Sequence, residues 1–182
     1  MAEILLSSET FIKSVTNVSD NLAGKYILPS LREAQEIGLR GILGDKLLDK
    51  LKRLKKEGDL ETEADGVYLT LVNRCQYYLA YQTITEVVNR ISYKIVNFGV
   101  AKSADENLQV ATQDEIAKQQ YFYQSKADAC CLDLQHFLLD NRSDYPELTE
   151  CCCHRIESNL HSAATCGIFL GGARNRIKRR VK

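Results

Sequence analysis

Apolar residues recur at intervals of three or four along most of the chain, the spacing that lines one face of an α-helix. This spacing predicts a mainly α-helical protein, a bundle of about four to five helices, over residues 8–15, 21–40, 46–57, 62–93 and 113–140. The last helix opens with a capping box, in which Thr112 and Glu115 satisfy backbone N–H groups at the helix start. We therefore expect a helical bundle that forms a single domain.

Proline and glycine interrupt this pattern between the second and third helices. Pro29 lacks a backbone N–H, so we expect a kink or a break near residues 26–30. Gly38, Gly41 and Gly44 predict a tight turn around residues 42–43. Gly58 is expected to end the third helix.

Two segments have an extended, β-like character. Residues 92–100 alternate and contain β-branched side chains, which predicts a short strand or arm ending at Gly99. Residues 166–172 form an apolar run bracketed by glycines and predict a second arm. The expected organisation is a helical part over residues 1–165, followed by an arm and basic tail over residues 166–182, within one domain overall.

Charge is divided unevenly between these two parts. The whole chain has 24 basic and 24 acidic residues, but its last nine residues contain six basic and no acidic side chains. Residues 1–173 therefore hold 18 basic and 24 acidic residues, a formal charge of −6. A neutral total excludes a uniformly basic nucleic-acid coat, and the division suggests two different neighbours.

The arm and tail contain the candidate interface residues. Ile168, Phe169 and Leu170 would be apolar anchors, and a locally packed hairpin is an equally open interpretation of them. The basic candidates are Arg174, Arg176, Lys178, Arg179 and Arg180. They could contact an acidic protein surface or DNA phosphates.

Two further groups of side chains favour structural interpretations. The tyrosines of the fourth helix are expected in the core or at a subunit interface, rather than as a platform for stacking bases. They are Tyr68, Tyr77, Tyr78 and Tyr81. The basic run of the third helix is interpreted as a solvated helix face, in preference to a nucleic-acid contact. Its members are Lys50, Lys52, Arg53, Lys55 and Lys56.

Seven cysteines raise the question of a metal site. The first residues lack the pattern of a secretory signal, and no stretch reaches the ~18 apolar residues of a membrane helix. We therefore expect a cytosolic protein with reduced thiols and no membrane contact. Cys130–Cys131 and Cys151–His154 could suggest zinc, but adjacent cysteines lack the usual ligand spacing. Small apolar residues on helix faces are the favoured interpretation, with no metal or cofactor.

Sequence motifs of catalysis are missing from the chain. It has no phosphate-binding loop, dinucleotide fingerprint, zinc-protease helix or nucleophile elbow. Nothing in the sequence therefore indicates an enzyme.

Two stretches carry a resemblance to a known family. Lys25–Glu36 followed by Ile42–Leu51 has the pattern I-x-P-x-[IL]-x-x-A-Q, then [IL]-L-G-x-x-[LF]-[LY]-x-x-L. With the Tyr-rich helix, Tyr145–Leu148 and the closing Gly167–Gly172 segment, it resembles small head–tail connector proteins of tailed bacteriophages and prophages. The resemblance is closest to versions from crAss-like and related gut phages.

The resemblance implies a non-enzymatic virion protein. Such connectors form homo-oligomeric rings, typically of twelve subunits, that dock on the portal and on adjacent neck or tail proteins and extend the DNA channel. The expected location is the virion neck, assembled in the host cytoplasm. The alternative is a cytosolic helical binding or regulatory module whose basic tail contacts DNA. A metal-dependent enzyme built on Cys130, Cys131 and Cys151–His154 is the least favoured hypothesis.

Overall fold

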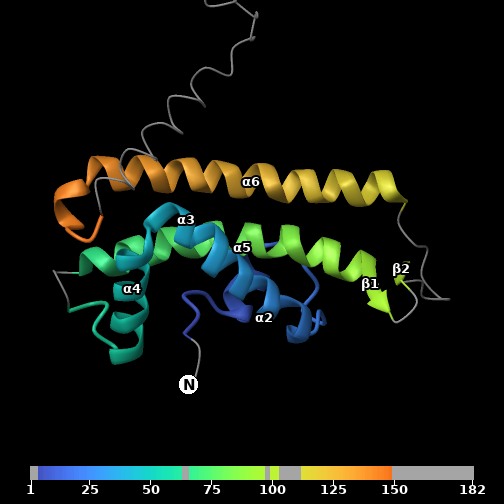
Figure 1. Ribbon diagram of the computed structural model, residues 1–182, viewed down its shortest axis with the longest axis horizontal. Coiled ribbons are helices and arrows are strands. Elements are labelled where there is room, and N and C mark those ends of the chain that lie inside the picture. The colour runs from blue at the N-terminus through green and yellow to red at the C-terminus, as the bar shows by residue number, and fades with distance from the viewer. Residues whose placement is uncertain (1–3, 63–65, 97–98, 103–111, 149–182) are drawn as a thin grey trace, which may run out of the picture.

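A computed structural model of the chain describes residues 4–62, 66–96, 99–102 and 112–148. Figure 1 shows a layered arrangement in which the two longest helices, α5 (Val67–Ser92) and α6 (Gln113–Asp140), run antiparallel beside one another. The shorter helices α1 (Glu9–Val15), α2 (Gly24–Glu33) and α4 (Asp45–Glu57) belong to the first third of the chain. The prediction of a mainly helical bundle is confirmed.

The core lies where these helices meet. Helix α5 contacts α6 along its length and also contacts α1 and α2 on its other side. Leu71, Leu79 and Ile84 of α5 are almost fully buried, as are Leu31 of α2 and Leu134 of α6. Each such side chain contributes about 1.5–3 kcal/mol by leaving water. The long helices are therefore held mainly by apolar packing, as the three-to-four-residue spacing predicted.

Helix α4 matches its prediction closely. Leu47, Leu48, Leu51 and Leu54 form its buried face. Gly58 adopts the left-handed conformation, with φ of 85°, and its N–H bonds to the Leu54 carbonyl. This is the usual reason for a glycine after a helix, because other residues pay a steric penalty at positive φ.

The region between α2 and α4 differs from its prediction. Helix α2 runs through Pro29 without a break and is followed by a π-helix (Ala34–Leu39) and α3 (Arg40–Leu43). The tight turn expected at residues 42–43 is wrong, because Ile42 and Leu43 are buried in α3. Burial of these side chains outweighs the turn preference of Gly38 and Gly41, and the helical path ends at Gly44, with φ of 80°.

Helix starts were predicted less accurately than helix ends. Helix α2 begins at Gly24, with Ala23 as its N-cap, and α5 begins at Val67 after Gly66, which has φ of 78°. Both start later than the apolar spacing suggested. The capping box of α6 is present as predicted, with the Thr112 and Glu115 side chains each bonded to the other's backbone N–H.

The segment expected as one arm at residues 92–100 has a different form. Ser92 is the last residue of α5, and strands β1 (Tyr93–Val96) and β2 (Gly99–Lys102) pair antiparallel with each other. Tyr93 lies opposite Lys102, and Val96 lies opposite Gly99. A short strand is therefore present, but it pairs within the same segment. The second expected arm, residues 166–172, lies outside the described residues.

Candidate functional site

The candidate interface residues all follow Leu148, the last position that the structure describes. Ile168, Phe169, Leu170, Arg174, Arg176, Lys178, Arg179 and Arg180 thus lie outside the described part of the chain. The residues just before them, Tyr145–Leu148, are described and belong to the resemblance. They are the last described residues, and Tyr145–Leu148 is called the exit segment below.

Tyr145 anchors this exit to the start of α5. Its ring is 1% exposed, and its hydroxyl donates to the Val67 carbonyl at 3.2 Å. The ring meets Tyr68 edge-on, with centroids 5.8 Å apart, and contacts Phe137 of α6 at 6.1 Å. The exit segment is therefore packed between both long helices.

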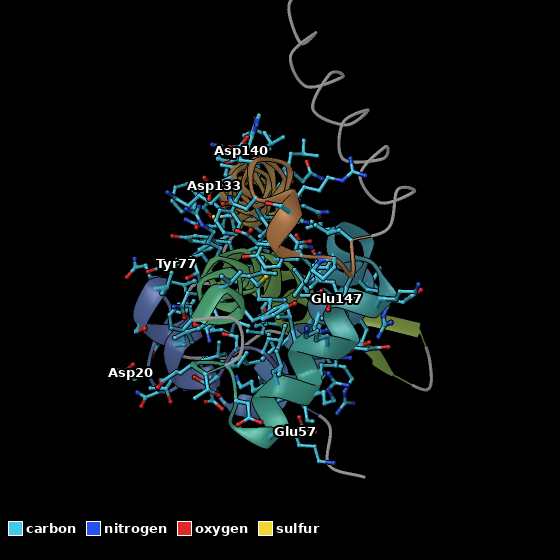
Figure 2. All side chains as sticks on the ribbon, turned by 90° about the vertical axis from the view of Figure 1, so that its left-hand side faces the viewer. Asp20, Glu57, Tyr77, Asp133, Asp140 and Glu147 are labelled. Carbon is cyan, nitrogen blue, oxygen red and sulfur yellow. The ribbon has the colours of Figure 1, made fainter. Side chains whose placement is uncertain are left out.

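Glu147 adds an ionic contact between the exit segment and α4. Lys50 Nζ lies 2.8 Å from one carboxylate oxygen of Glu147, and the Tyr68 hydroxyl donates to the other at 3.0 Å. Lys50 also donates to the Tyr68 hydroxyl at 2.8 Å. Burial alone would raise the pKa of Glu147, but the hydrogen bonds from Lys50 and Tyr68 bring it below its ordinary value. Figure 2 shows Glu147 beside α4.

The basic run of α4 is largely engaged within the bundle rather than solvated. Lys50 bonds to Glu147, and Lys52 pairs with Glu36 of the π-helix. Lys55 donates to the Leu6 carbonyl at 2.8 Å, and burial lowers the pKa of its ammonium group. The interpretation of this run as a solvated face is therefore wrong for these three lysines. They are used to attach neighbouring elements to α4.

The π-helix carries a cluster of charges. Arg40 pairs with Glu36 at 2.6 Å and with Asp45 at 2.7 Å, where α4 begins. Burial opposes ionisation of Glu36, but hydrogen bonds from Lys52, Arg40 and Gln35 outweigh it and lower its pKa to about 2. The cluster fixes the direction of the chain as it passes from the π-helix to α4.

Gln35, within the motif that carries the resemblance, is completely buried. Its side chain accepts from the Leu6 amide at 2.7 Å and donates to the Ile4 carbonyl at 3.0 Å. The Leu6 carbonyl accepts from Gln76 of α5 at 3.0 Å as well as from Lys55. The motif therefore holds the extended segment before α1 against the bundle, which is a structural role.

The described cysteines do not form a metal site. Cys75 is fully buried in α5, and Cys130 and Cys131 are half-buried in α6. Burial raises the pKa of all three thiols, that of Cys131 to about 11. Within the described ranges, no group of three or more His, Cys, Asp or Glu side chains could hold a metal ion. Cys151–His154 lie beyond those ranges.

Several large apolar side chains are exposed on the bundle. Ile37 on the π-helix is 70% exposed, and Tyr121 and Phe122 on α6 are 76% and 49% exposed. Of the tyrosines of α5, Tyr68 and Tyr78 are buried as expected, whereas Tyr77 is half exposed. Sequence reasoning missed the α6 pair. The available signal was the run of three aromatic residues, Tyr121, Phe122 and Tyr123. Three consecutive residues cannot all lie on the inner face of a helix, and here only Tyr123 is buried.

Two grooves run beside the long helices. One, of about 560 Å³, is lined by Arg74 and Tyr77 of α5 and by Cys130 and Asp133 of α6, with the Arg74–Asp133 ion pair crossing it at 2.7 Å. Figure 2 shows Tyr77 and Asp133 on the side of the molecule away from Glu147. The other, of about 470 Å³, is mainly apolar and lies near the end of α5.

Helix length and hydropathy bear on membrane contact. Among the helices that the structure describes, none combines the length and the apolar character needed to cross a bilayer.

Comparison with known proteins gives one match. A family model covers residues 39–158, and its description is a family of unknown function, DUF6712. The matched range extends from the end of the π-helix through α6 and the exit segment. No curated protein and no solved structure matches the chain.

Proposed function

The chain belongs to the DUF6712 family, whose function is unknown, and we propose that it is a structural subunit of a phage head–tail connector. In this proposal, copies of the chain form a ring, with twelve as the expected number. The ring docks on the portal, continues the DNA channel and offers its other face to an adjacent neck or tail protein. It acts in the virion, without catalysis and without a cofactor.

Exposed apolar side chains on a rigid helical body are the observation that carries the proposal. Tyr121 and Phe122 are neighbours on α6, and both keep much of their surface in water. Adjacent exposed aromatic residues are typical of protein–protein contact surfaces, where aromatic side chains are enriched. Such a surface suits a subunit that packs against copies of itself.

The residues that carry the resemblance support the same conclusion. Gln35 binds the backbone of Ile4 and Leu6, and Tyr145 and Glu147 fasten the exit segment. These contacts position elements within a scaffold.

The distribution of charge fits a ring around DNA. The net negative charge of residues 1–173 would repel the phosphate backbone and let DNA slide through the ring. The basic end, residues 174–182, could bind an acidic portal surface or DNA itself. Both roles are part of the proposal.

Co-expression with the cognate portal protein tests it. We expect closed rings of the chain on the portal by negative-stain electron microscopy, and the chain among the proteins of purified virions. A chain that stays monomeric beside the portal and is absent from virions would refute the proposal.

A surface variant sharpens the test. Tyr121→Glu places a charge on the exposed aromatic pair, and His136→Glu places the same charge at an exposed position near the other end of the same helix. We expect Tyr121→Glu to reduce ring yield about tenfold, as for loss of an interface anchor, with His136→Glu close to wild type. Equal yields for the two variants would exclude this surface as a ring contact.

A further inference from the structure

The apolar groove near the end of α5 is open on one side. Ile84, Val87 and Tyr123 form a buried floor, whereas Ile91 is 37% exposed and Val18 and Leu22 are half-buried at the edges. Polar side chains at its rim, among them Asn17, Asn21 and Gln119, could bond to an extended backbone. The groove therefore has the character of a site for a short apolar peptide segment.

We infer that this groove binds Ile168–Leu170 from a second copy of the chain, an inference that rests on the proposed connector function. The segment is three large apolar residues flanked by glycines, so it can enter as an extended strip. The apolar floor would cover the three side chains while the polar rim meets the backbone.

The positions of the groove and of the last described residues allow a contact between copies. Tyr145 bonds to Val67, the first residue of α5, whereas the groove is formed by residues 84–91 at the other end. These points are about 30 Å apart along the helix. A segment that extends from one end of a subunit and fills a groove at the opposite end of the next makes a head-to-tail contact, and such contacts form a ring when the rotation between subunits closes.

The chain length allows this contact. Nineteen residues separate Leu148 from Ile168 and span up to about 60 Å when extended. Helix α6, with 28 residues, is about 42 Å long. The segment can therefore pass the end of its own bundle and reach a neighbour.

Charge complements the apolar fit. Asp20 lies in the chain between the groove residues Ser19 and Asn21, and Asp114 and Glu115 occupy the first turn of α6, before Gln119; all three are exposed. The basic neighbours of groove positions are Lys118 and Arg90, and Arg90 is paired with Glu33. The residues that follow Leu170 in the chain are basic from Arg174 onward and carry no acid. A segment docked in the groove would bring its basic end toward these carboxylates.

A cross-linking experiment on the full chain tests the inference. Phe169 is replaced by the photo-cross-linking residue benzoylphenylalanine, and equal amounts of ¹⁴N- and ¹⁵N-labelled protein are mixed during assembly. We expect mass spectrometry to find cross-links from residue 169 to groove peptides in mixed-label pairs. Cross-links confined to same-label pairs would show docking within one chain and overturn the inference, as would cross-links that avoid the groove.

A matched pair of variants checks the groove itself. Ile91→Glu adds a charge at the groove edge, and Ile37→Glu adds one at an exposed apolar position on the π-helix, outside the groove. We expect Ile91→Glu to reduce mixed-label cross-links about tenfold and Ile37→Glu to leave them unchanged, with both variants showing wild-type circular dichroism. An equal effect of the two, or no effect of either, would overturn the inference.

The same samples separate this inference from the connector proposal. Rings on the portal without mixed-label cross-links in the groove would overturn the groove assignment and leave the connector function in place. Mixed-label cross-links in oligomers that never bind the portal would do the reverse.

Discussion

Lys50 of α4 forms an ion pair with Glu147 at 2.8 Å, although α5 and α6 lie between the two residues in the sequence. Both side chains are largely buried, at 17% and 20% exposure. Because Tyr68 bonds to each of them, the pair joins α4, α5 and the exit segment in one network. The position of the exit segment on the bundle therefore depends on contacts that α4 makes.

Breaking this pair should destabilise the protein. Glu147→Gln or Lys50→Met is expected to cost about 1–2 kcal/mol, because each removes this largely buried ion pair and Lys50→Met also removes the hydrogen bond from Lys50 to Tyr68. The double variant should cost less than the sum of the two, measured by urea denaturation. Glu57→Gln is the control, because its pair with Arg53 is exposed and 3.9 Å long; we expect about 0.5 kcal/mol or less. Strict additivity of the two network variants would contradict the coupling.

Glu36 should control part of the acid sensitivity. Its folded-state pKa, about 2, lies below its ordinary value of 4.5, so its ionised form stabilises the fold. That contribution is complete above pH 4.5 and is lost as pH falls toward 2. We expect Glu36→Gln to be less stable at pH 7 by about 1–2 kcal/mol, after allowance for solvent screening, with the difference vanishing near pH 2. Thermal unfolding at several pH values checks this, and a difference that is constant with pH would refute it.

Two glycines in neighbouring helical turns should respond oppositely to alanine. A Cβ at Gly38 would overlap the hydroxyl oxygen of the buried Tyr78, whereas a Cβ at Gly41 meets nothing. We expect Gly38→Ala to cost about 1–3 kcal/mol through overpacking and Gly41→Ala to gain about 0.5–1 kcal/mol through helix propensity. Melting temperatures of the two variants provide the measurement. Similar shifts for both would argue against the close approach of Tyr78.

Thr83 should tolerate loss of its hydroxyl. It is fully buried in α5, and its hydroxyl has no hydrogen-bond partner among the described residues, whereas that of Thr85 donates to the Tyr81 carbonyl at 3.1 Å. We expect Thr83→Val to be neutral or stabilising by about 1 kcal/mol, and Thr85→Val to cost about 0.5–1 kcal/mol. Chemical denaturation of both variants checks the order. A costlier Thr83→Val would indicate a hydrogen bond to Thr83.

The helical architecture could be predicted from the sequence because two local signals, apolar spacing and helix-end residues, agreed with the packing. Helices α4 and α6 have an apolar face together with an end signal, Gly58 for α4 and the Thr112–Glu115 box for α6. Where the end signals were ambiguous, the predictions failed. Gly38 and Gly41 suggested a turn, yet the burial of Ile42 and Leu43 keeps the chain helical there.

The Lys50–Glu147 contact and the apolar groove were harder to predict from the sequence, because each combines residues that are distant along the chain. Nothing in the sequence near Lys50 indicates that its partner is Glu147, and the apolar groove draws Val18, Ile84 and Tyr123 from three different segments. The spacing of apolar residues identifies the helix face that packs in the core. It does not show which part of that face has no neighbouring element over it.

The segment before α1 has a consequence for the dynamics of the protein. Leu6 belongs to no helix or strand, yet its amide donates to the buried Gln35 side chain. Its carbonyl accepts hydrogen bonds from the Lys55 and Gln76 side chains. The amide hydrogen of Leu6 should therefore exchange with deuterium from solvent about as slowly as the amides in the middle of α5, since breaking its bond requires either the buried Leu6 side chain or Gln35 to leave the core. The first described residues and the long helices would then open together, as one cooperative unit.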